Sequence, residues 1–305
     1  MPQYRFYQLD VFTRTPLAGN PLAVFPEAEG LDASTMQALA REMNLSETTF
    51  VLPSTTATRR VRFFTPAAEI PLAGHPTIGT WWLLAELGAL RHLPRNGTGR
   101  VTQETGRGVL PVDVTLADGR PADVVMTQAA PVYGPTVDDR AALAAAVGGD
   151  GATLADGPAP QVVSTALPQL MAQVTSRAAL ARLPSGGTGL ALSQLLRRFG
   201  TDCVMLFALT GGSDPTAYCR MFAPGLAVSE DPATGSAAGA LGAYLVRHGL
   251  VRPTAGTADL IFEQGVEIGR PSRIAVGVRT DAAGSITEVT VGGTAVRLIT
   301  GDVTL

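Results

Sequence analysis

Short runs of apolar and β-branched residues, many alternating with polar ones, recur along this chain and predict a strand-rich protein. Glycine and proline separate the runs, as expected where strands end in turns. The predicted strands are 4–12, 48–52, 61–64, 109–116, 124–128, 161–163, 171–174, 203–208, 218–222, 260–262, 273–278 and 286–291. A chain of this kind has few helices, and their patterns stand out.

Two of the predicted helices are apolar on every side. The segment 80–90 carries one charge, Glu86, and the segment 237–246 carries none. A helix without a polar stripe must be covered all round, and about eleven residues are too few to span a bilayer. We therefore expect a central helix inside a curled sheet, twice over. An amphipathic helix is predicted from Ser34, and weaker helical patterns occupy 138–147 and 193–198.

The turns that precede the two apolar helices read as copies of one another. The first comprises Phe-Thr-Pro at 64–66 and Ala-Gly-His-Pro-Thr-Ile-Gly-Thr at 73–80; the second comprises Phe-Ala-Pro at 222–224 and Ser-Glu-Asp-Pro-Ala-Thr-Gly-Ser at 229–236. When the copies are aligned on Pro76 and Pro232, the paired residues are His75 with Asp231, Gly79 with Gly235 and Thr80 with Ser236. The pattern predicts a fused duplication with two unlike polar residues facing each other.

Each of these turns has the signature of a helix start. Proline suits the first helical position, so His75 and Asp231 are predicted at the N-caps. Free backbone N–H groups and the positive end of the helix dipole then gather around both residues, and such ends bind carboxylates and phosphates. Asp231 also fits a simple capping role, whereas histidine is a poor cap. The turn therefore favours function more strongly at His75.

The length of 305 residues suits two domains, each with its own core. We place the first domain at residues 1–130, with the final strands, about 290–305, folding back onto it. The second domain then covers 131–289. The fold class expected from these patterns is α+β.

Charge and composition exclude several functions. The net charge of −3 and the absence of a basic tract argue against a nucleic-acid partner. The first ten residues lack the features of a signal peptide, so we expect a soluble cytoplasmic protein without a membrane partner. All 23 basic residues are arginine, which removes a Schiff-base lysine, pyridoxal-phosphate chemistry and a P-loop lysine.

Neither a metal nor a cofactor is expected. The two cysteines, Cys203 and Cys219, form no metal or redox motif with the three histidines, and both read as buried thiols. The glycine-rich stretches at 147–151 and 184–189 follow no strand and read as loops, which argues against a nucleotide cofactor.

Glu47 is the third candidate for catalysis. It lies between Leu45 and Phe50, where the amphipathic helix gives way to a strand. Partial burial there would raise the pKa of its carboxyl group toward the range useful for a general acid or base. A solvated glutamate at such a junction is the alternative.

Four motifs, in matching order and spread over essentially the whole chain, resemble the PhzF-like family, named for the phenazine-biosynthesis isomerase and related to diaminopimelate epimerase. The motifs are Gly-Asn-Pro at 19–21, Ser-Glu-Thr-Thr-Phe at 46–50, Phe-Thr-Pro at 64–66 with Ala-Gly-His-Pro at 73–76, and Glu-Asp-Pro-Ala-Thr-Gly-Ser at 230–236. The resemblance implies two similar domains, each a β-barrel around a central helix, with the active site in the cleft between them, and a homodimer.

The resemblance also implies roles for individual residues. Glu47 corresponds to the glutamate that moves a proton between carbons of a dihydro-hydroxyanthranilate ring, with His75 and Asp231 flanking the substrate. The substrate's carboxylate would be held by four further residues, Gly74, Thr234, Gly235 and Ser236. The implied reaction is a cofactor-independent isomerisation of a small carboxylate-bearing metabolite.

Two alternatives stay open from the sequence. An amino-acid epimerase or racemase would use Glu47 with His75 or Asp231, since neither duplicated turn carries the cysteine that related epimerases use. A non-catalytic small-molecule-binding protein would keep the cleft without turnover.

Overall fold

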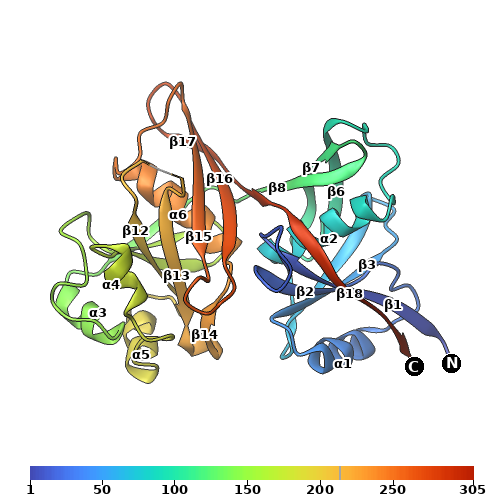
Figure 1. Cartoon of the computed structure of the whole chain (residues 1–305), viewed down its shortest axis with the longest axis horizontal. Coiled ribbons are helices and arrows are strands. Elements are labelled where there is room, and N and C mark those ends of the chain that lie inside the picture. Colours follow the sequence, from blue (N-terminus) through green and yellow to red (C-terminus); the bar gives the residue numbers. More distant parts are fainter. Residues whose placement is uncertain (213) are drawn as a thin grey trace. The chain divides into compact units, whose positions relative to one another are not determined.

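The computed structural model describes residues 1–212 and 214–305, which divide into two compact units. The first unit comprises Met1–Thr127 and Gly292–Leu305, and the second comprises Gln128–Val291. Both are rich in strands and contain helices, so the chain is of the α+β class (Figure 1). Within the described residues, no helix combines the length and apolar character needed to cross a membrane.

The first unit is a curved sheet with helices on its two faces. Its elements are β1 (Gln3–Val11), β2 (Asn20–Phe25), α1 (Ala33–Met43), β3 (Glu47–Leu52), β4 (Arg59–Phe64), β5 (Glu69–Ile70), α2 (Gly74–Glu86), β6 (Gly97–Thr105), β7 (Gly108–Ala117), β8 (Arg120–Thr127) and β18 (Ala295–Thr304). Paired strands follow the order β18-β1-β2-β3-β4-β6-β7-β8. Because α2 contacts strands at both ends of this order, the sheet curves around it.

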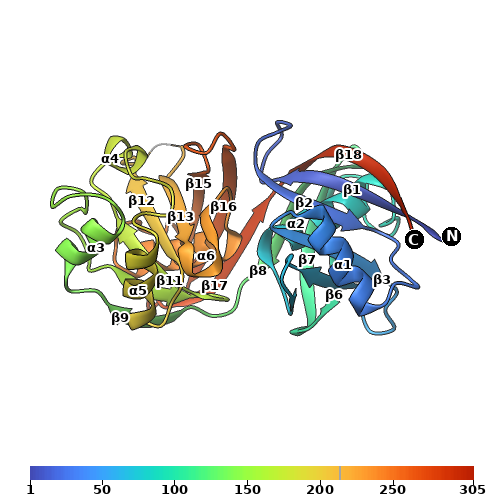
Figure 2. The same ribbon diagram turned by 90° about the horizontal axis from the view of Figure 1, so that it is seen from below.

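Successive side chains of a strand point to opposite faces of the sheet, and each face of this sheet packs against a different helix. Phe50 packs under α1 with Phe25, their rings stacked at 4.9 Å, and Phe64 meets the edge of the Phe50 ring. Thr49, the neighbour of Phe50 on β3, points the other way and bonds Thr80 of α2 through hydroxyl oxygens 2.8 Å apart. Figure 2 shows α1 and α2 against these strands.

The second unit has the same kind of core. Its elements are β9 (Val132–Thr136), α3 (Arg140–Ala146), β10 (Gln161–Ser164), β11 (Pro168–Gln173), α4 (Arg177–Ala181), α5 (Leu190–Arg198), β12 (Val204–Leu209), β13 (Ala217–Ala223), a 3₁₀ turn (Pro224–Leu226), β14 (Val228–Asp231), α6 (Gly235–Arg247), β15 (Thr257–Gln264), β16 (Ser272–Thr280) and most of β17 (Ile286–Gly293). Paired strands follow the order β9-β10-β11-β12-β13-β15-β16, and α6 contacts β10 and β11 as well as β15 and β16.

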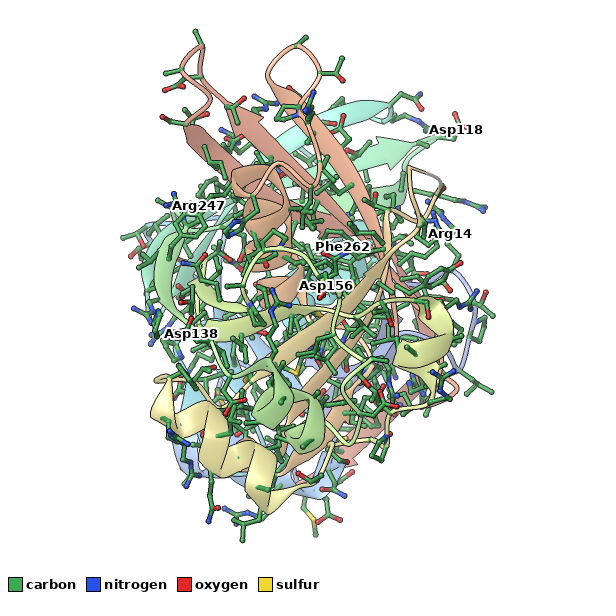
Figure 3. All side chains as sticks on the ribbon, turned by 90° about the vertical axis from the view of Figure 1, so that its left-hand side faces the viewer. Arg14, Asp118, Asp138, Asp156, Arg247 and Phe262 are labelled. Atoms are coloured by element: carbon green, nitrogen blue, oxygen red, sulfur yellow. The ribbon has the colours of Figure 1, made fainter. Side chains whose placement is uncertain are left out.

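In the second unit, most apolar side chains are buried and most charged side chains lie at the surface, as in other globular proteins. Phe262 of β15 is fully buried, whereas Asp138 and Arg247 are exposed at the periphery (Figure 3). Helices α3, α4 and α5 cover a cluster of apolar residues from β11, β12 and β13. The second unit therefore places α6 and the three shorter helices against one set of strands.

The two units repeat one series of strand pairings. From β1 to β7 the pairings are β1–β2 antiparallel, β2–β3 parallel, β3–β4 and β4–β5 antiparallel, β4–β6 parallel and β6–β7 antiparallel. The same series runs from β10 to β16. The apolar helix follows the short fifth strand in each series. The duplication suggested by the sequence motifs is therefore present in the topology.

The prediction that both apolar helices are covered on all sides is confirmed. Every residue of α2 from His75 to Ala85 is buried, and ten of the thirteen residues of α6 are buried. Both helices begin earlier than predicted, and α2 ends at Glu86, so that residues 87–90 of the predicted segment lie beyond it. Their first turns contain glycine and hydroxyl residues, which do not belong to an apolar run.

Candidate active site

His75 is the second residue of α2, and its imidazole is buried beside Glu47 at the start of β3. The His75 Nδ1 and Glu47 Oε2 atoms lie 3.6 Å apart, with side chains 9% and 16% exposed. Burial lowers the pKa of His75 from 6.5 to about 3, although a hydrogen bond with the Pro21 backbone opposes this shift. His75 is therefore neutral at pH 7 and does not form an ion pair with Glu47.

The Gly-Asn-Pro and Ser-Glu motifs meet because β2 and β3 are parallel neighbours. Leu22 is paired with Glu47, which brings Asn20 next to Ser46. The Ser46 hydroxyl donates to Asn20 Oδ1 at 3.2 Å, and Asn20 is fully buried. This hydrogen bond attaches the residue before Glu47 to the neighbouring strand and so helps to fix the position of Glu47.

In the second unit, Asp231 is the last residue of β14 and lies opposite Met221. The Thr234 hydroxyl donates a short hydrogen bond to Asp231 Oδ2. Gly235 begins α6, and Ser236 follows it and accepts a hydrogen bond from Gln169 Nε2 at 2.9 Å. All four predicted site residues of the second unit therefore lie within residues 231–236, where β14 ends and α6 begins.

The predicted N-caps are wrong. The N-cap of α2 is Ala73 and that of α6 is Thr234, so His75 lies inside its helix and Asp231 lies on a strand. The reason is that β14 pairs with β13 as far as Asp231. Pro232 consequently belongs to a three-residue connection, and it does not open the helix.

The alignment of the two turns on Pro76 and Pro232 is also wrong. Strand register pairs Ile70 with Phe63 in the first unit and Asp231 with Met221 in the second. Pro71 and Pro232 follow directly. A Cβ atom on Gly106 would lie 2.9 Å from Pro71 Cα, and one on Gly265 would lie 2.6 Å from the Pro232 carbonyl oxygen.

Pro71 is therefore the counterpart of Pro232, and the helices confirm this register. Gly74 and Gly235 each begin a helix of thirteen residues. The counterpart of Asp231 is Ile70, and the counterpart of His75 is Ser236. The two unlike polar residues of the predicted pair do not occupy equivalent places.

A bidentate ion pair precedes the candidate residues in both units. Arg62 contacts Glu69 through two hydrogen bonds of 2.7 Å. Arg220 contacts Glu230 at 2.8 and 2.6 Å, and its Nη1 also donates to two backbone carbonyls. The second pair is buried, with both side chains 2% exposed, whereas Arg62 and Glu69 are 17% and 43% exposed.

Both thiols are unsuited to acid–base work. Burial raises the pKa of Cys203 to about 12 and raises the pKa of Cys219 as well. Within residues 1–212 and 214–305, no group of three His, Cys, Asp or Glu side chains is arranged to hold a metal ion.

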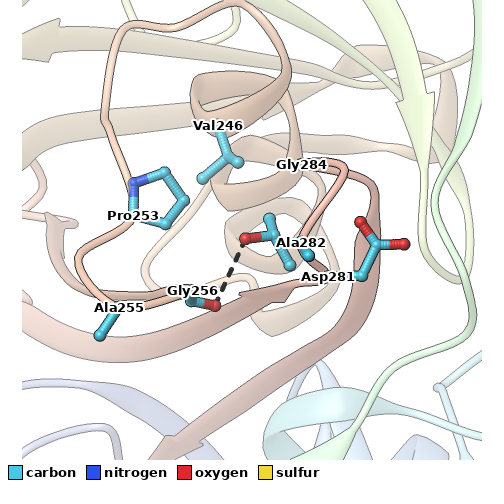
Figure 4. Close-up of a pocket in the computed structure, with 8 residues that line it drawn as sticks. Val246, Pro253, Ala255, Gly256, Asp281, Ala282 and Gly284 are labelled. Carbon is cyan, nitrogen blue, oxygen red and sulfur yellow. Dashed lines mark hydrogen bonds between the residues drawn. The ribbon is translucent and has the colours of Figure 1, made fainter.

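A cavity of about 630 Å³ in the second unit lies apart from the candidate residues. Its lining includes Val246, Pro253, Gly256 and Asp281 (Figure 4). With one carboxylate and no histidine or cysteine, this lining does not offer paired acid–base groups.

Sequence reasoning missed Gln264, Gln169 and Arg220. All three are buried polar residues on strands that contact the Asp231 turn or Ser236. A fully buried glutamine or arginine needs hydrogen-bond partners, but the sequence does not reveal which residues supply them. In the sequence, the signal that could have identified them was a polar residue within a run of apolar strand residues.

Residues 9–301 match the family described as phenazine biosynthesis-like protein, PhzC-PhzF. The chain belongs to this family. It is 37% identical over 292 residues to the trans-2,3-dihydro-3-hydroxyanthranilate isomerase of Pseudomonas aeruginosa, covering 95% of each chain. It is 36% identical to an uncharacterised isomerase of Clostridium acetobutylicum, covering 99% of each. The protein is accordingly an isomerase.

The solved structures agree with this family assignment. A PhzF-family protein of Bacillus anthracis matches with a TM-score of 0.89 at 28% identity, over 100% of both chains. A hydroxyproline epimerase of Agrobacterium vitis matches with a TM-score of 0.66 at 14% identity, over 99% of this chain and 92% of that one. The second likeness concerns the fold alone, which is the diaminopimelate epimerase-like fold.

Proposed function

We propose that this PhzC-PhzF family member moves a proton between two carbons of a small carboxylate-bearing metabolite, without a cofactor, and that Glu47 carries the proton. Two Pseudomonas relatives named trans-2,3-dihydro-3-hydroxyanthranilate isomerase make a dihydro-hydroxyanthranilate-like compound the first substrate to test.

The observation that carries this proposal is the contact between Glu47 and a neutral, buried histidine. A cation at that distance would hold Glu47 as a carboxylate and oppose its protonation. Neutral His75 imposes no such charge, so Glu47 stays able to accept a proton and return it. His75 Nε2 is buried and has no hydrogen-bond partner among the described residues, which suits it to contact a substrate.

The starts of the two central helices suit the substrate's carboxylate. Side chains of Asp32, Asp139 and Ser176 cap α1, α3 and α4. By contrast, α2, α5 and α6 begin without a side-chain cap bond, and of these three α2 and α6 contain candidate site residues in their first turns. Uncapped first-turn N–H groups and the helix dipole favour an anion. We therefore assign substrate binding to Gly74 in the first unit.

In the second unit we assign binding of the substrate's carboxylate to Gly235 and Ser236, and we place Thr234 beside the substrate with its hydroxyl proton directed to Asp231. Ser236 accepts a hydrogen bond from Gln169, which leaves its hydroxyl proton for an anion. We assign Asp231 to the same reaction as Glu47, as a catalytic group that flanks the substrate while Glu47 carries the proton.

An epimerase or racemase is the second candidate. A hydroxyproline epimerase shares the fold, and a protein of Pseudomonas aeruginosa titled a predicted epimerase is 32% identical. Inversion at one carbon needs a base on each side of it. With both thiols buried and their pKa values raised, the second base would be His75 or Asp231 rather than a cysteine.

The proposal extends to the finer architecture and setting that the family resemblance implies. Each central helix would lie inside a β-barrel, in domains at 1–130 with about 290–305 and at 131–289. The protein would act as a homodimer in the cytoplasm.

The test is proton exchange in D₂O followed by NMR. Wild type is incubated with trans-2,3-dihydro-3-hydroxyanthranilate and, separately, with a panel of amino and hydroxy acids. Deuterium at a carbon that was not the proton donor indicates isomerisation, and deuterium only at the original carbon indicates epimerisation. A wild-type protein that labels none of these compounds contradicts the proposal. A Glu47→Gln variant that binds a compound as well as wild type, with neither protein altering it, would indicate a binding protein.

A further inference from the structure

Gln264 is the last residue of β15, and its side chain reaches the connection between Asp231 and α6. The side chain is buried, with the residue 1% exposed. Its Nε2 donates to the Asp231 carbonyl oxygen at 2.7 Å and to Thr234 Oγ1 at 3.1 Å, and its Oε1 accepts from the Thr234 backbone N–H at 3.4 Å. One amide therefore ties the connection at three points.

The contact with the Asp231 carbonyl fixes the direction of these hydrogen bonds. A reversed amide would place two oxygen atoms 2.7 Å apart, which is repulsive. Nε2 therefore donates to Thr234, and the single hydroxyl proton of Thr234 is directed to the Asp231 carboxylate. The series runs from Gln264 through Thr234 to Asp231, and it sets the position of the carboxylate and the hydrogen bond that the carboxylate accepts.

The residue after Gln264 is a glycine, and this lets the backbone pass close to Pro232. Gly265 has φ +80°, and a Cβ atom there would lie 2.4 Å from the Arg270 carbonyl oxygen and 2.6 Å from that of Pro232. Only glycine lets the chain pass so close to Pro232. Gln264 is also paired with Cys219 on one side and Ser272 on the other, so its register is set by both neighbouring strands.

The first unit lacks this arrangement. The counterpart of Gly265 is Gly106, so the counterpart of Gln264 is Thr105, the last residue of β6. The Thr105 hydroxyl donates to the Gly108 carbonyl within its own hairpin. The three-point contact thus occurs in the unit that carries Asp231 and is absent where Ile70 takes its place.

We propose that Gln264 is a positioning residue, which holds the Asp231 carboxylate and Thr234 in the geometry that the proton-transfer reaction requires. This inference rests on the proposed function. Gln264 acts through its neighbours and does not touch the substrate.

The test compares Gln264→Met with Gln161→Met. Both replacements remove an amide and keep the length of the side chain. Gln161 Oε1 contacts His248 Nε2 at 3.0 Å, at the opposite end of α6 from Asp231, and thirteen helical residues span about 20 Å. With trans-2,3-dihydro-3-hydroxyanthranilate as the probe, Gln264→Met is expected to lower kcat by about thirty-fold with KM changed less than about threefold. Gln161→Met is expected to keep kcat within about twofold.

Gln264→Glu provides a readout that a purely structural role would not move. The carboxylate cannot donate to the Asp231 carbonyl or to Thr234, but the protonated acid can donate one hydrogen bond. Its kcat relative to wild type is therefore expected to rise by about tenfold as pH falls from 8 to 5. Amide hydrogen exchange at Thr234 is expected to speed up in Gln264→Met and to stay unchanged in Gln161→Met.

The outcomes separate the two proposals. A wild-type enzyme that labels no compound overturns the proposed function, and the role of Gln264 falls with it. An active wild type with an equally active Gln264→Met overturns the role of Gln264 alone. Equal losses of kcat in both glutamine variants, in proportion to their melting temperatures, also overturn it.

Discussion

Glu47 opens β3 in the first unit, and the same place in the second unit is held by Cys203. The register defines this pair, because Thr48 lies opposite Phe64 and Val204 lies opposite Phe222. Conversely, the place of Asp231 in the second unit is held by Ile70 in the first. Each copy of the strand order therefore carries one candidate carboxylate, and the two carboxylates stand on different strands.

The two units therefore share their packing but differ in the side chains that could exchange protons. Both units keep the glycine against a proline, the ion pair before the helix and the apolar central helix. The side chains that could donate or accept protons differ between the units: Glu47 corresponds to Cys203, Asp231 to Ile70 and His75 to Ser236. A buried thiol whose pKa is raised to about 12 cannot replace the carboxylate of Glu47 at neutral pH.

The equivalent ion pairs give the largest expected difference in stability. Glu230→Gln removes the bidentate partner of the buried Arg220 guanidinium and leaves it only Glu267, whose Oε2 lies 4.0 Å from Arg220 Nε, so we expect the free energy of unfolding to fall by about 3 kcal/mol. Glu69→Gln removes the partner of Arg62 in a more exposed pair, and we expect a loss below about 1 kcal/mol. Urea unfolding followed by circular dichroism measures both. Equal losses would mean that burial does not distinguish the two pairs.

The equivalent glycines test the register of the two copies. Gly265→Ala must place a Cβ atom against two carbonyl oxygens at a positive φ, so we expect a loss of about 3 kcal/mol. Gly106→Ala meets Pro71 at 2.9 Å without the unfavourable φ, and we expect about 1 kcal/mol. Thermal unfolding of the two variants gives the comparison. Two variants as stable as wild type would contradict the pairing of each glycine with its proline.

The buried imidazole of His75 should make the first unit sensitive to acid. Its pKa is about 3 in the folded state, below the ordinary 6.5, so the unfolded chain binds more protons between these values. The stability from keeping His75 neutral is complete above pH 6.5 and is lost as pH falls toward 3. Between pH 7 and pH 5 the loss is about 2 kcal/mol.

This loss is measured by urea unfolding followed by tryptophan fluorescence, because both tryptophans, Trp81 and Trp82, lie on α2. His75→Gln should lose about 2 kcal/mol less than wild type over the same interval, whatever its stability at pH 7. His92→Gln, at an exposed position, is the control and should follow wild type. A His75→Gln variant with the wild-type pH dependence would contradict the burial of a neutral imidazole.

The sequence was enough to predict that each unit contains a buried, apolar helix, whereas the roles of the candidate site residues stay predictions. A helix such as α6, without a charge until Arg247, has to be buried, and that requirement is visible in the residues themselves. The register of the two copies was harder to predict. Pro76 and Pro232 give an attractive alignment, yet the strand before each helix sets the counterpart of Pro232 at Pro71.

Contacts over long distances along the chain could not be predicted. Gln264 follows the Asp231 turn by some thirty residues, and its contact depends on the pairing of β13 with β15. The contact of His75 with Glu47 likewise depends on how α2 packs against β2 and β3. Local pattern shows that such residues are buried and polar, but only the assembled sheet decides what they touch.

The most direct measurement is deuterium incorporation from D₂O into trans-2,3-dihydro-3-hydroxyanthranilate by wild type, Glu47→Gln and Cys203→Ser. We expect a rate at least about a thousandfold lower for Glu47→Gln, because the amide cannot carry a proton, and a rate within about twofold of wild type for Cys203→Ser. Undiminished exchange in Glu47→Gln, or an equal loss in Cys203→Ser, would contradict the claim that Glu47 carries the proton and that its counterpart Cys203 does not.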